Sequence, residues 1–458
     1  MSRSTVKLAR FSDDYQHIID SDDQQVALDD PRVVHFAAGG STIYSKRFTV
    51  NLYEKFGRRC RISDPTSAEV MQYAKELCSG RECVPFVAIT GHFLKDIRNC
   101  YNANDVTVYT SLNQEGPCQN AAWPVIWQTF AERLNLKNIL FPPNTIAVAN
   151  LLGLSPMHAQ MAGVGTIVAH LLDEAENALR VLAQDKDSAL SVFSAATDRL
   201  IESVKTIEGK NDFDQAVTQW ADNVAKIPLK ATVEETPKVL IFGGLNLYFV
   251  HFPITAYFIE LGVIPKVVDI AEAQIWLQSE KVARFGFKKG KIRPSQQFDK
   301  TYLEDLISSE TPDQQEAAAV LSVRNGMALM DLLLSQYRKL MEGSGLLFDE
   351  HMHFPDMAEA GHEYVSSNGF NETSPTTGKY VRAIERGLFD GLINLGSFNC
   401  QPAMNSQAII RPIANANDVP YAAIDVEGPW ITTNQCRLLE TIAVQAKRIR
   451  KKKNSIAA

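Results

Sequence analysis

The chain has 458 residues, a length that fits two or three domains with sizeable cores. Hydrophobic residues make up 45% and charged residues 22% of the chain, without a run of eighteen apolar residues, so the sequence predicts no membrane span. The net charge of −7 argues against general nucleic-acid binding, and the N-terminus shows no apolar export signal, so we expect a cytoplasmic protein.

The first part of the chain predicts a polar arm followed by an α/β domain. Residues 1–32 are polar and acidic, which is typical of a loosely held N-terminal arm. From VVHFAAGG (33–40) onward, short β-rich runs alternate with helical stretches such as TSAEVMQYAKELCSG. The apolar run VPFVAITG and the alternating DVTVYT (105–110) continue this pattern. We therefore expect an α/β domain over residues 33–155.

A helical connection and a second α/β domain follow. Leucine and valine recur at helical spacing over residues 156–232, as on a packing face. KVLIFGGLNL (238–247) then predicts a strand running into a glycine turn, followed by a helix and a second strand, VIPKVVDI. We place this domain at 233–446, with a helical insertion at about 300–345. The expected fold class is α/β, with two Rossmann-like doubly wound parallel-sheet domains and helical insertions.

The last residues, 447–458, form a basic tail that contains KRIRKKK. Such a charge run is typical of a frayed, solvated helix end, and less often of a docking patch.

Three of the seven cysteines share a sequence context. Because an odd count in a reducing compartment makes a disulfide framework improbable, the thiols are buried core groups, nucleophiles or metal ligands. Cys83 in ECVPF, Cys118 in GPCQN and Cys400 in FNCQP each adjoin proline near a predicted strand or helix end. Neighbouring amides can stabilise a ligand thiolate there. Inert core thiols are the alternative, since free cysteine is among the most buried residue types.

The segments around these cysteines resemble the 2-hydroxyacyl-CoA dehydratase family, and especially the C-terminal region of the large CoA-substrate-specific enzyme activases and double-cubane cluster proteins. CSGRECVPFVAITGHFLKD is similar to the family's SGKECLP…TGD segment, and GPCQNAAW to its GPCR-x-GQY phrase. PKVLIFGGLNLYFVHFPITAYFIELG is similar to the segment that opens the second domain. LGSFNCQPAMNSQAIIRPIA resembles the F-x-CMP motif, and the phrases follow in the family's order between about residues 33 and 446.

The resemblance implies an iron–sulfur protein. Family members hold a 4Fe-4S or double-cubane cluster between two Rossmann-like domains, and the matching positions here are Cys83, Cys118 and Cys400. Three thiolates would leave one iron open, which suits low-potential electron transfer to, or reduction or dehydration of, an acyl-CoA or small-molecule substrate. Gln401 replaces the family's methionine, and VEGPW replaces its D-G-Q phrase, so the family's substrate does not carry over.

The partners follow from the same resemblance. No G-x-x-x-x-G-K-[ST] motif is present, so we do not expect the chain to hydrolyse ATP. Family dehydratases receive electrons from a separate ATP-dependent iron–sulfur activator, which implies such an activator, or another low-potential electron donor, as a partner. A homodimer or a heterodimer is compatible with this arrangement.

Further residues are weaker candidates. Cys78 could be an additional ligand or a packed helix-end thiol, Cys100 and Cys436 are weaker still, and Cys60 is expected to be structural. His92 in TGHF could donate to a cluster sulfur, or be a satisfied loop histidine.

The stretch DEHMHFPDMAEAGHE (349–363) offers a separate set of divalent-metal ligands, with a solvated loop as the alternative. Its candidate ligands are Asp349, Glu350, His351, His353, Asp356, Glu359 and His362. For the whole protein, the alternatives to a cluster are a non-redox two-domain protein that binds a small ligand, or a family member that has lost its chemistry.

Overall fold

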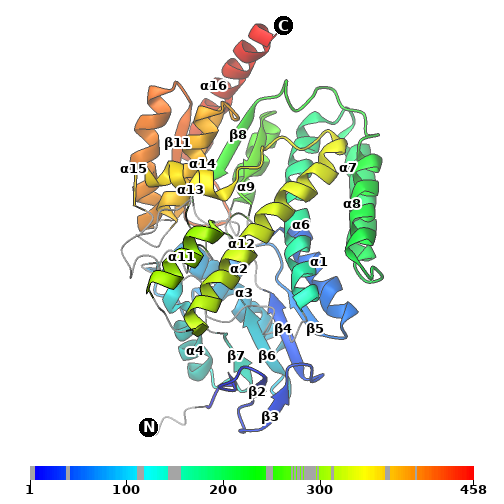
Figure 1. The fold of residues 1–458 in the computed structure, drawn as a ribbon, viewed down its shortest axis with the longest axis vertical. Coiled ribbons are helices and arrows are strands. Elements are labelled where there is room, and N and C mark those ends of the chain that lie inside the picture. The colour runs from blue at the N-terminus through cyan, green and yellow to red at the C-terminus, as the bar shows by residue number, and fades with distance from the viewer. Residues whose placement is uncertain are drawn as a thin grey trace.

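The computed structural model describes residues 6–37, 42–110, 118–142, 156–243, 251–269, 299–310, 314–366, 372–397 and 400–457, with isolated residues between 272 and 296. Two parallel four-stranded sheets flanked by helices form its two halves (Figure 1). This confirms the predicted α/β class with Rossmann-like doubly wound domains.

The first sheet has the strand order β5-β4-β6-β7, and all its neighbouring strands are parallel. Its strands are β4 (Val33–Ala37), β5 (Arg59–Ile62), β6 (Val106–Thr110) and β7 (Ile139–Leu140). Its helices are α1 (Ile43–Lys55), α2 (Ala68–Ala74), α3 (Val84–Cys100) and α4 (Trp123–Arg133). The predicted apolar run VPFVAITG is the first half of α3, so it is helical.

The second sheet has the order β11-β10-β8-β9 and is also parallel throughout. Its strands are β8 (Lys238–Phe242), β9 (Ile264–Val267), β10 (Gly391–Ser397) and β11 (Tyr421–Val426). Its helices are α9 (Phe252–Glu260), α13 (Phe354–His362), α14 (Thr373–Glu385), α15 (Gln401–Ala416) and α16 (Thr433–Ala457). When the four strands of each sheet are numbered by their order in the chain, both sheets have the same spatial order, 2-1-3-4. The glycine turn predicted after β8 falls mostly outside the described residues.

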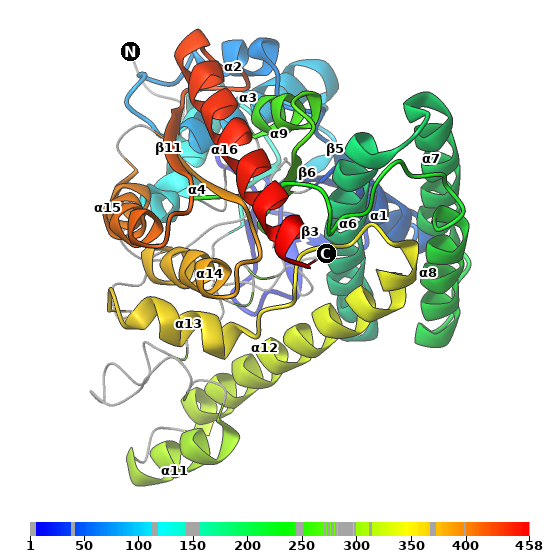
Figure 2. The ribbon, with the colours of Figure 1, turned by 90° about the horizontal axis from the view of Figure 1, so that it is seen from above.

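Long helices join the two halves. They are α6 (Pro156–Leu182), α7 (Lys186–Ser203), α8 (Lys210–Val224), α11 (Lys300–Glu310) and α12 (Gln314–Met341). Figure 2 shows α7 and α8 on the side away from α13 to α15, with α12 crossing between them. One continuous hydrophobic core runs from Phe36 in the first sheet to Leu392 in the second. The two halves are therefore packed as one body.

The helix over Glu316–Ser344 has the length and mean hydropathy of a membrane-crossing helix. Only 22% of its apolar window is buried. Within that range, Arg338 binds Glu174 and Asp331 contacts two histidines, so these two charged side chains pair with other segments of the protein.

The N-terminal region differs from the expected loose arm. Residues 10–27 form an antiparallel three-stranded sheet of β1 (Arg10–Phe11), β2 (His17–Ile19) and β3 (Gln25–Ala27). Ile18 and Val26 pack in a small core with Val106 and Leu140 of the first sheet. Alternate side chains of such short strands face solvent, which explains the polar composition.

The basic tail also differs from a frayed end. It continues α16 to Ala457, and both Arg450 and Lys453 bind the buried carboxylate of Asp390, at 2.9 Å each. Two of the basic side chains of the tail therefore hold α16 against the loop before β10.

Candidate metal centre

The three cysteines of the sequence hypothesis all lie at helix starts. Cys83 directly precedes α3, Cys118 precedes a short 3-10 turn (Gln119–Ala122) that leads into α4, and Cys400 precedes α15. Each has an extended backbone, and a proline stands in the first turn of α3, α4 and α15. Proline is favoured there because those amides have no helical partner. Gly116, Pro117 and Asn399 of the flanking motifs lie outside the described residues.

The three thiols interact with one another although they come from both halves. The pKa of Cys118 is raised to about 12, first by burial and then by Glu372, and the charges of Cys83 and Cys400 add to the rise. The pKa of Cys400 is also raised to about 12, by burial, by Glu372 and by Cys83. Since such charge effects decline with distance, they place the three thiols in one region of the fold. Among the described residues, the groups of ligand atoms that lie within 4.8 Å of one another do not include these three sulfurs.

Glu372 is a fourth ionisable group at this place, and sequence reasoning missed it. Glu372 is the residue directly before α14, and its side chain is buried. This burial raises the pKa of its carboxyl group to about 7. The next residue, Thr373, donates a hydrogen bond from its hydroxyl to the carbonyl oxygen of Pro402 at 3.3 Å. This bond holds the start of α14 against the first turn of α15, beside Cys400.

The electrostatics argue against nucleophilic catalysis by these thiols. The pKa of Cys83 is raised to about 11, chiefly by burial, while the backbone amide of Phe86 offsets part of the rise. Reactive cysteines have lowered pKa values and lie near cations, whereas the charged side chains that most affect these thiols are acidic. Three half-buried thiols whose main charged neighbours are acidic match a centre that brings its own positive charge. A cluster therefore fits this donor set.

The thiols also do not behave as ordinary core residues. Cys83 packs against the edge of the hydrophobic core, but Cys118 and Cys400 are not part of that core among the described residues. The charged groups that most affect Cys118 and Cys400 are Glu372 and the other thiols.

The other cysteines lie elsewhere. Cys78 follows α2, and its pKa is raised to about 12 by burial and by Glu82, without a contribution from the three thiols. Cys100 ends α3, about 25 Å from its start at 1.5 Å per residue. Cys60 lies in β5 and Cys436 in the first turn of α16. None of them joins the site in the described part of the chain.

His92 contacts the segment that leads into α2. Its ring nitrogen lies 3.0 Å from the hydroxyl of Thr66, on the side of α3 that packs against α2. Burial, together with the charge of Lys46, lowers its pKa to about 3, so it is neutral. The hypothesis that His92 donates to a cluster sulfur has no support in this geometry.

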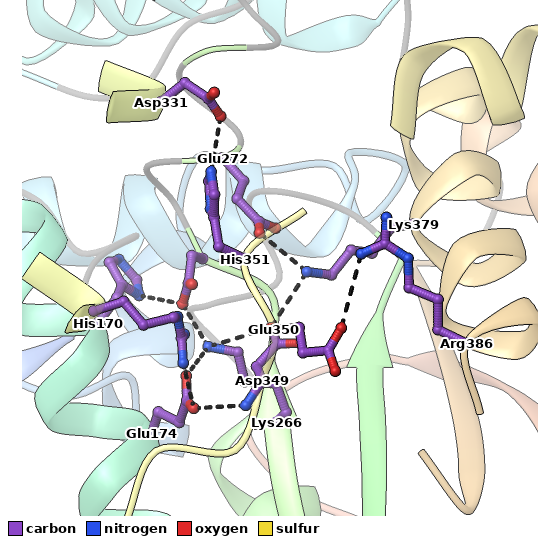
Figure 3. A network of polar contacts seen from close by, with 12 residues as sticks. His170, Glu174, Lys266, Glu272, Asp331, Asp349, Glu350, His351, Lys379 and Arg386 are labelled. Carbon is purple, nitrogen blue, oxygen red and sulfur yellow. Dashed lines mark hydrogen bonds and ion pairs between the residues drawn. The ribbon is translucent and has the colours of Figure 1, made fainter. Parts of the chain in front are cut away.

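A second polar cluster lies at the end of β9 (Figure 3). Lys266 donates to Glu174 at 2.7 Å and to Asp269 at 2.8 Å, and Lys379 donates to Asp349 at 3.3 Å. All five side chains are buried, and they come from α6, β9, α14 and the segments that follow β9 and α12.

The carboxylates of this cluster are paired with lysine side chains of the same cluster. The oxygens of Glu174, Asp269 and Asp349 lie within 4.8 Å of one another, a spacing that could suit a metal ion. The ammonium group of Lys266 contacts all three, however, and the three carboxylates raise its pKa against the effect of burial. The ammonium group of Lys266 therefore occupies the position that a metal ion would take. We call the ion-pair cluster of Glu174, Lys266, Asp269, Asp349 and Lys379 the buried joint, because it connects the elements that carry these residues.

The predicted metal-binding stretch 349–363 is divided among three environments. Asp349 belongs to the buried joint, and Glu350 lies 3.9 Å from Arg386. His351 and His353 both contact Asp331 of α12, which the sequence analysis did not include. The remaining candidates lie on α13 and share no metal cluster with them among the described residues; they are Asp356, Glu359 and His362.

A cavity of about 100 Å³ lies between α1, α6, α8 and α12. Apolar side chains such as Phe48, Leu52 and Phe213 line it, and none of the three thiols does. It is separate from the candidate metal centre.

Comparison with known proteins adds no relative. No protein-family model matches the chain, and no curated protein matches it significantly.

Proposed function

We propose that Cys83, Cys118 and Cys400 hold an iron–sulfur cluster between the two Rossmann-like domains, for low-potential electron transfer to, or reduction or dehydration of, an acyl-CoA or small-molecule substrate. The observation that carries the proposal is the placement of the three cysteines at the starts of helices in both halves, close enough for the charges of Cys83 and Cys400 to raise the pKa of Cys118. Ligand sites of open parallel sheets form beyond the carboxyl ends of the strands, where Cys118 and Cys400 lie.

The chain's residues have distinct tasks in this proposal. When bound, such a cluster would supply low-potential electrons and Lewis acidity. The three thiolates bind it, and the backbone amides of Phe86, Asn120 and Ala403, which lower the thiol pKa values, stabilise their negative charge. The carboxyl oxygen of Glu372, with a pKa near 7, can hold or release a proton beside the cluster.

The substrate class and the electron donor come from the family resemblance. An acyl-CoA or another small molecule would be the substrate, and an ATP-dependent iron–sulfur activator or another low-potential donor would be the partner. The continuous core and the buried joint disfavour the alternative of two domains that close on a ligand, because such domains need a weakly packed hinge.

Anaerobic purification tests the proposal. We expect a brown protein with stoichiometric iron and sulfide and with broad visible absorption. Cys400→Ser should lose most of its iron, whereas the matched variant Cys60→Ser, which changes a thiol within β5, should keep it. A colourless wild-type protein, with all seven thiols titratable after reconstitution with iron and sulfide, would support the non-redox alternative.

A further inference from the structure

We propose that Asp331, His351 and His353 form a second, independent site that binds a divalent transition-metal ion such as Zn²⁺. The Nε2 atom of His351 lies 3.0 Å from Oδ1 of Asp331, and Nδ1 of His353 lies 2.7 Å from Oδ2. One ligand atom from each residue lies within 4.8 Å of the other two. This site does not depend on the proposed cluster.

The local sequence explains why the two imidazoles converge. His351 and His353 flank Met352, and successive side chains of an extended segment point to opposite sides. Met352 and Phe354 are 1% and 3% exposed, so they anchor the segment in the core. The two histidines therefore face away from that anchor, toward α12.

The segment is fixed before any ion binds. Asp349 is held by Lys379 in the buried joint, and α13 begins at Phe354, so both ends of the histidine pair are constrained. Asp331 comes from α12, and Figure 3 shows its carboxylate next to the ring of His351. A preformed site costs less ordering on binding.

The donor set is that of a zinc or related site. Two imidazole nitrogens and a carboxylate are usual ligands of Zn²⁺, at about 2.0–2.2 Å from the ion. Ligand atoms that share such an ion lie about 3.0–3.5 Å apart. The two nitrogen–oxygen distances here are 3.0 and 2.7 Å, and all three ligand atoms lie within 4.8 Å of one another.

The site also has an open side. The side chain of His353 is 61% exposed, whereas those of His351 and Asp331 are 12% and 15% exposed. Water or another ligand can therefore complete the coordination of an ion held by three protein atoms. Two histidines and one carboxylate with open positions also suit Fe(II). Through Asp331, the ion would tie α12 to the segment that leads into α13.

The test uses Co²⁺ as a spectroscopic stand-in for Zn²⁺ on metal-free, reduced full-length protein. Nitrogen and oxygen ligation gives d–d bands without a thiolate-to-cobalt charge-transfer band, which separates this site from the cysteines. His353→Ala removes the most exposed ligand, and His362→Ala, a histidine of the same stretch on α13, is the matched control. The midpoint of thermal unfolding without metal checks that each variant is folded.

We expect wild type and His362→Ala to bind one Co²⁺ through nitrogen and oxygen, and His353→Ala to bind it at least about tenfold more weakly. Zn²⁺ should displace the Co²⁺. Absence of the d–d bands in wild type, or equal affinity of His353→Ala and wild type, would overturn the proposal.

Discussion

Cys118 and Cys400 occupy equivalent positions in two sheets that share one strand order. Each follows the third strand of its sheet and starts the helical segment that leads to the fourth, β7 or β11. Ligand sites of open parallel sheets form beyond the carboxyl ends of the strands. Each half therefore offers one cysteine at the same topological position to the candidate metal centre.

The equivalence extends to a second pair of positions, but with different chemistry. Cys83 starts α3, the helix before the third strand of the first sheet, and Glu372 precedes α14, the helix before the third strand of the second. The first half thus has a thiol, and the second half a carboxyl group, at the residue before this helix. The four ionisable groups at the candidate metal centre are therefore three thiols and one carboxyl group, and not four thiols.

Replacement of Glu372 tests its proximity to all three thiols. In iron-free protein above pH 7, the charge of Glu372 opposes thiolate formation, because it raises the pKa of Cys83, Cys118 and Cys400. Glu372→Gln should therefore lower these pKa values and accelerate alkylation by iodoacetamide at pH 8 to 9. Mass spectrometry of the modified peptides measures each rate.

Glu82→Gln is the control for this experiment. Glu82 contributes to the raised pKa of Cys83 and of Cys78, but is not among the groups that most affect Cys118 and Cys400. Its replacement should change alkylation near residue 80 only. Unchanged rates at Cys118 and Cys400 in Glu372→Gln would show that the carboxyl group lies elsewhere.

The same carboxyl group predicts a pH dependence of stability. Its pKa is 4.5 in the unfolded chain and about 7 in the folded one, so the folded state binds the proton more tightly. Stability is then full below pH 4.5 and is lost as the pH rises through 7, by about 3 kcal/mol in the iron-free protein. Urea unfolding of wild type and Glu372→Gln between pH 5 and 8 measures it. A constant difference between the two proteins would contradict the buried carboxyl group.

Lys266 should be critical for stability. Lys266→Met leaves the carboxylates of Glu174 and Asp269 buried without their central cation, and should cost about 3–5 kcal/mol of unfolding free energy. Lys205→Met is the control, because Lys205 pairs with Glu54 and Glu202 on the surface and should cost less than about 1 kcal/mol. Equal urea midpoints for the two variants would argue against the joint.

Gly91 tests whether the packing of α3 positions Cys83. A Cβ atom at Gly91 would lie 2.1 Å from the carbonyl oxygen of Val70, so Gly91→Ala must push α3 away from α2. We expect a loss of about 1–3 kcal/mol in stability and a lower iron content. Gly343→Ala, where a Cβ meets no atom within 4 Å, should leave the iron content unchanged. If Gly91→Ala kept its full iron content, the contact between α3 and α2 at Gly91 would not be needed to position Cys83.

The sequence predicts the two sheets well, because their strands are short apolar runs between helical stretches. KVLIF and GLINLGS, for example, become β8 and β10, which are buried along their whole length. The three cysteines can also be singled out, because proline follows or precedes each thiol at an element end. Their meeting depends on the packing of two halves, which no local pattern encodes.

The residues whose roles the sequence did not predict were missed for one physical reason. Glu372 and Asp331 act through partners that are remote in sequence, such as Cys83 and His351, so neither carries a local signal. Lys266 lies inside an apolar strand, where a charge is unexpected unless distant carboxylates pair with it. The N-terminal sheet has strands of two or three residues, too short for a clear alternation.

The most direct test of the central claim is an anaerobic crystal structure with diffraction data collected at the iron edge. The account predicts an anomalous iron peak bonded to the sulfurs of Cys83, Cys118 and Cys400, with Glu372 beside it. Free thiols at these three positions in protein reconstituted with iron and sulfide would contradict it.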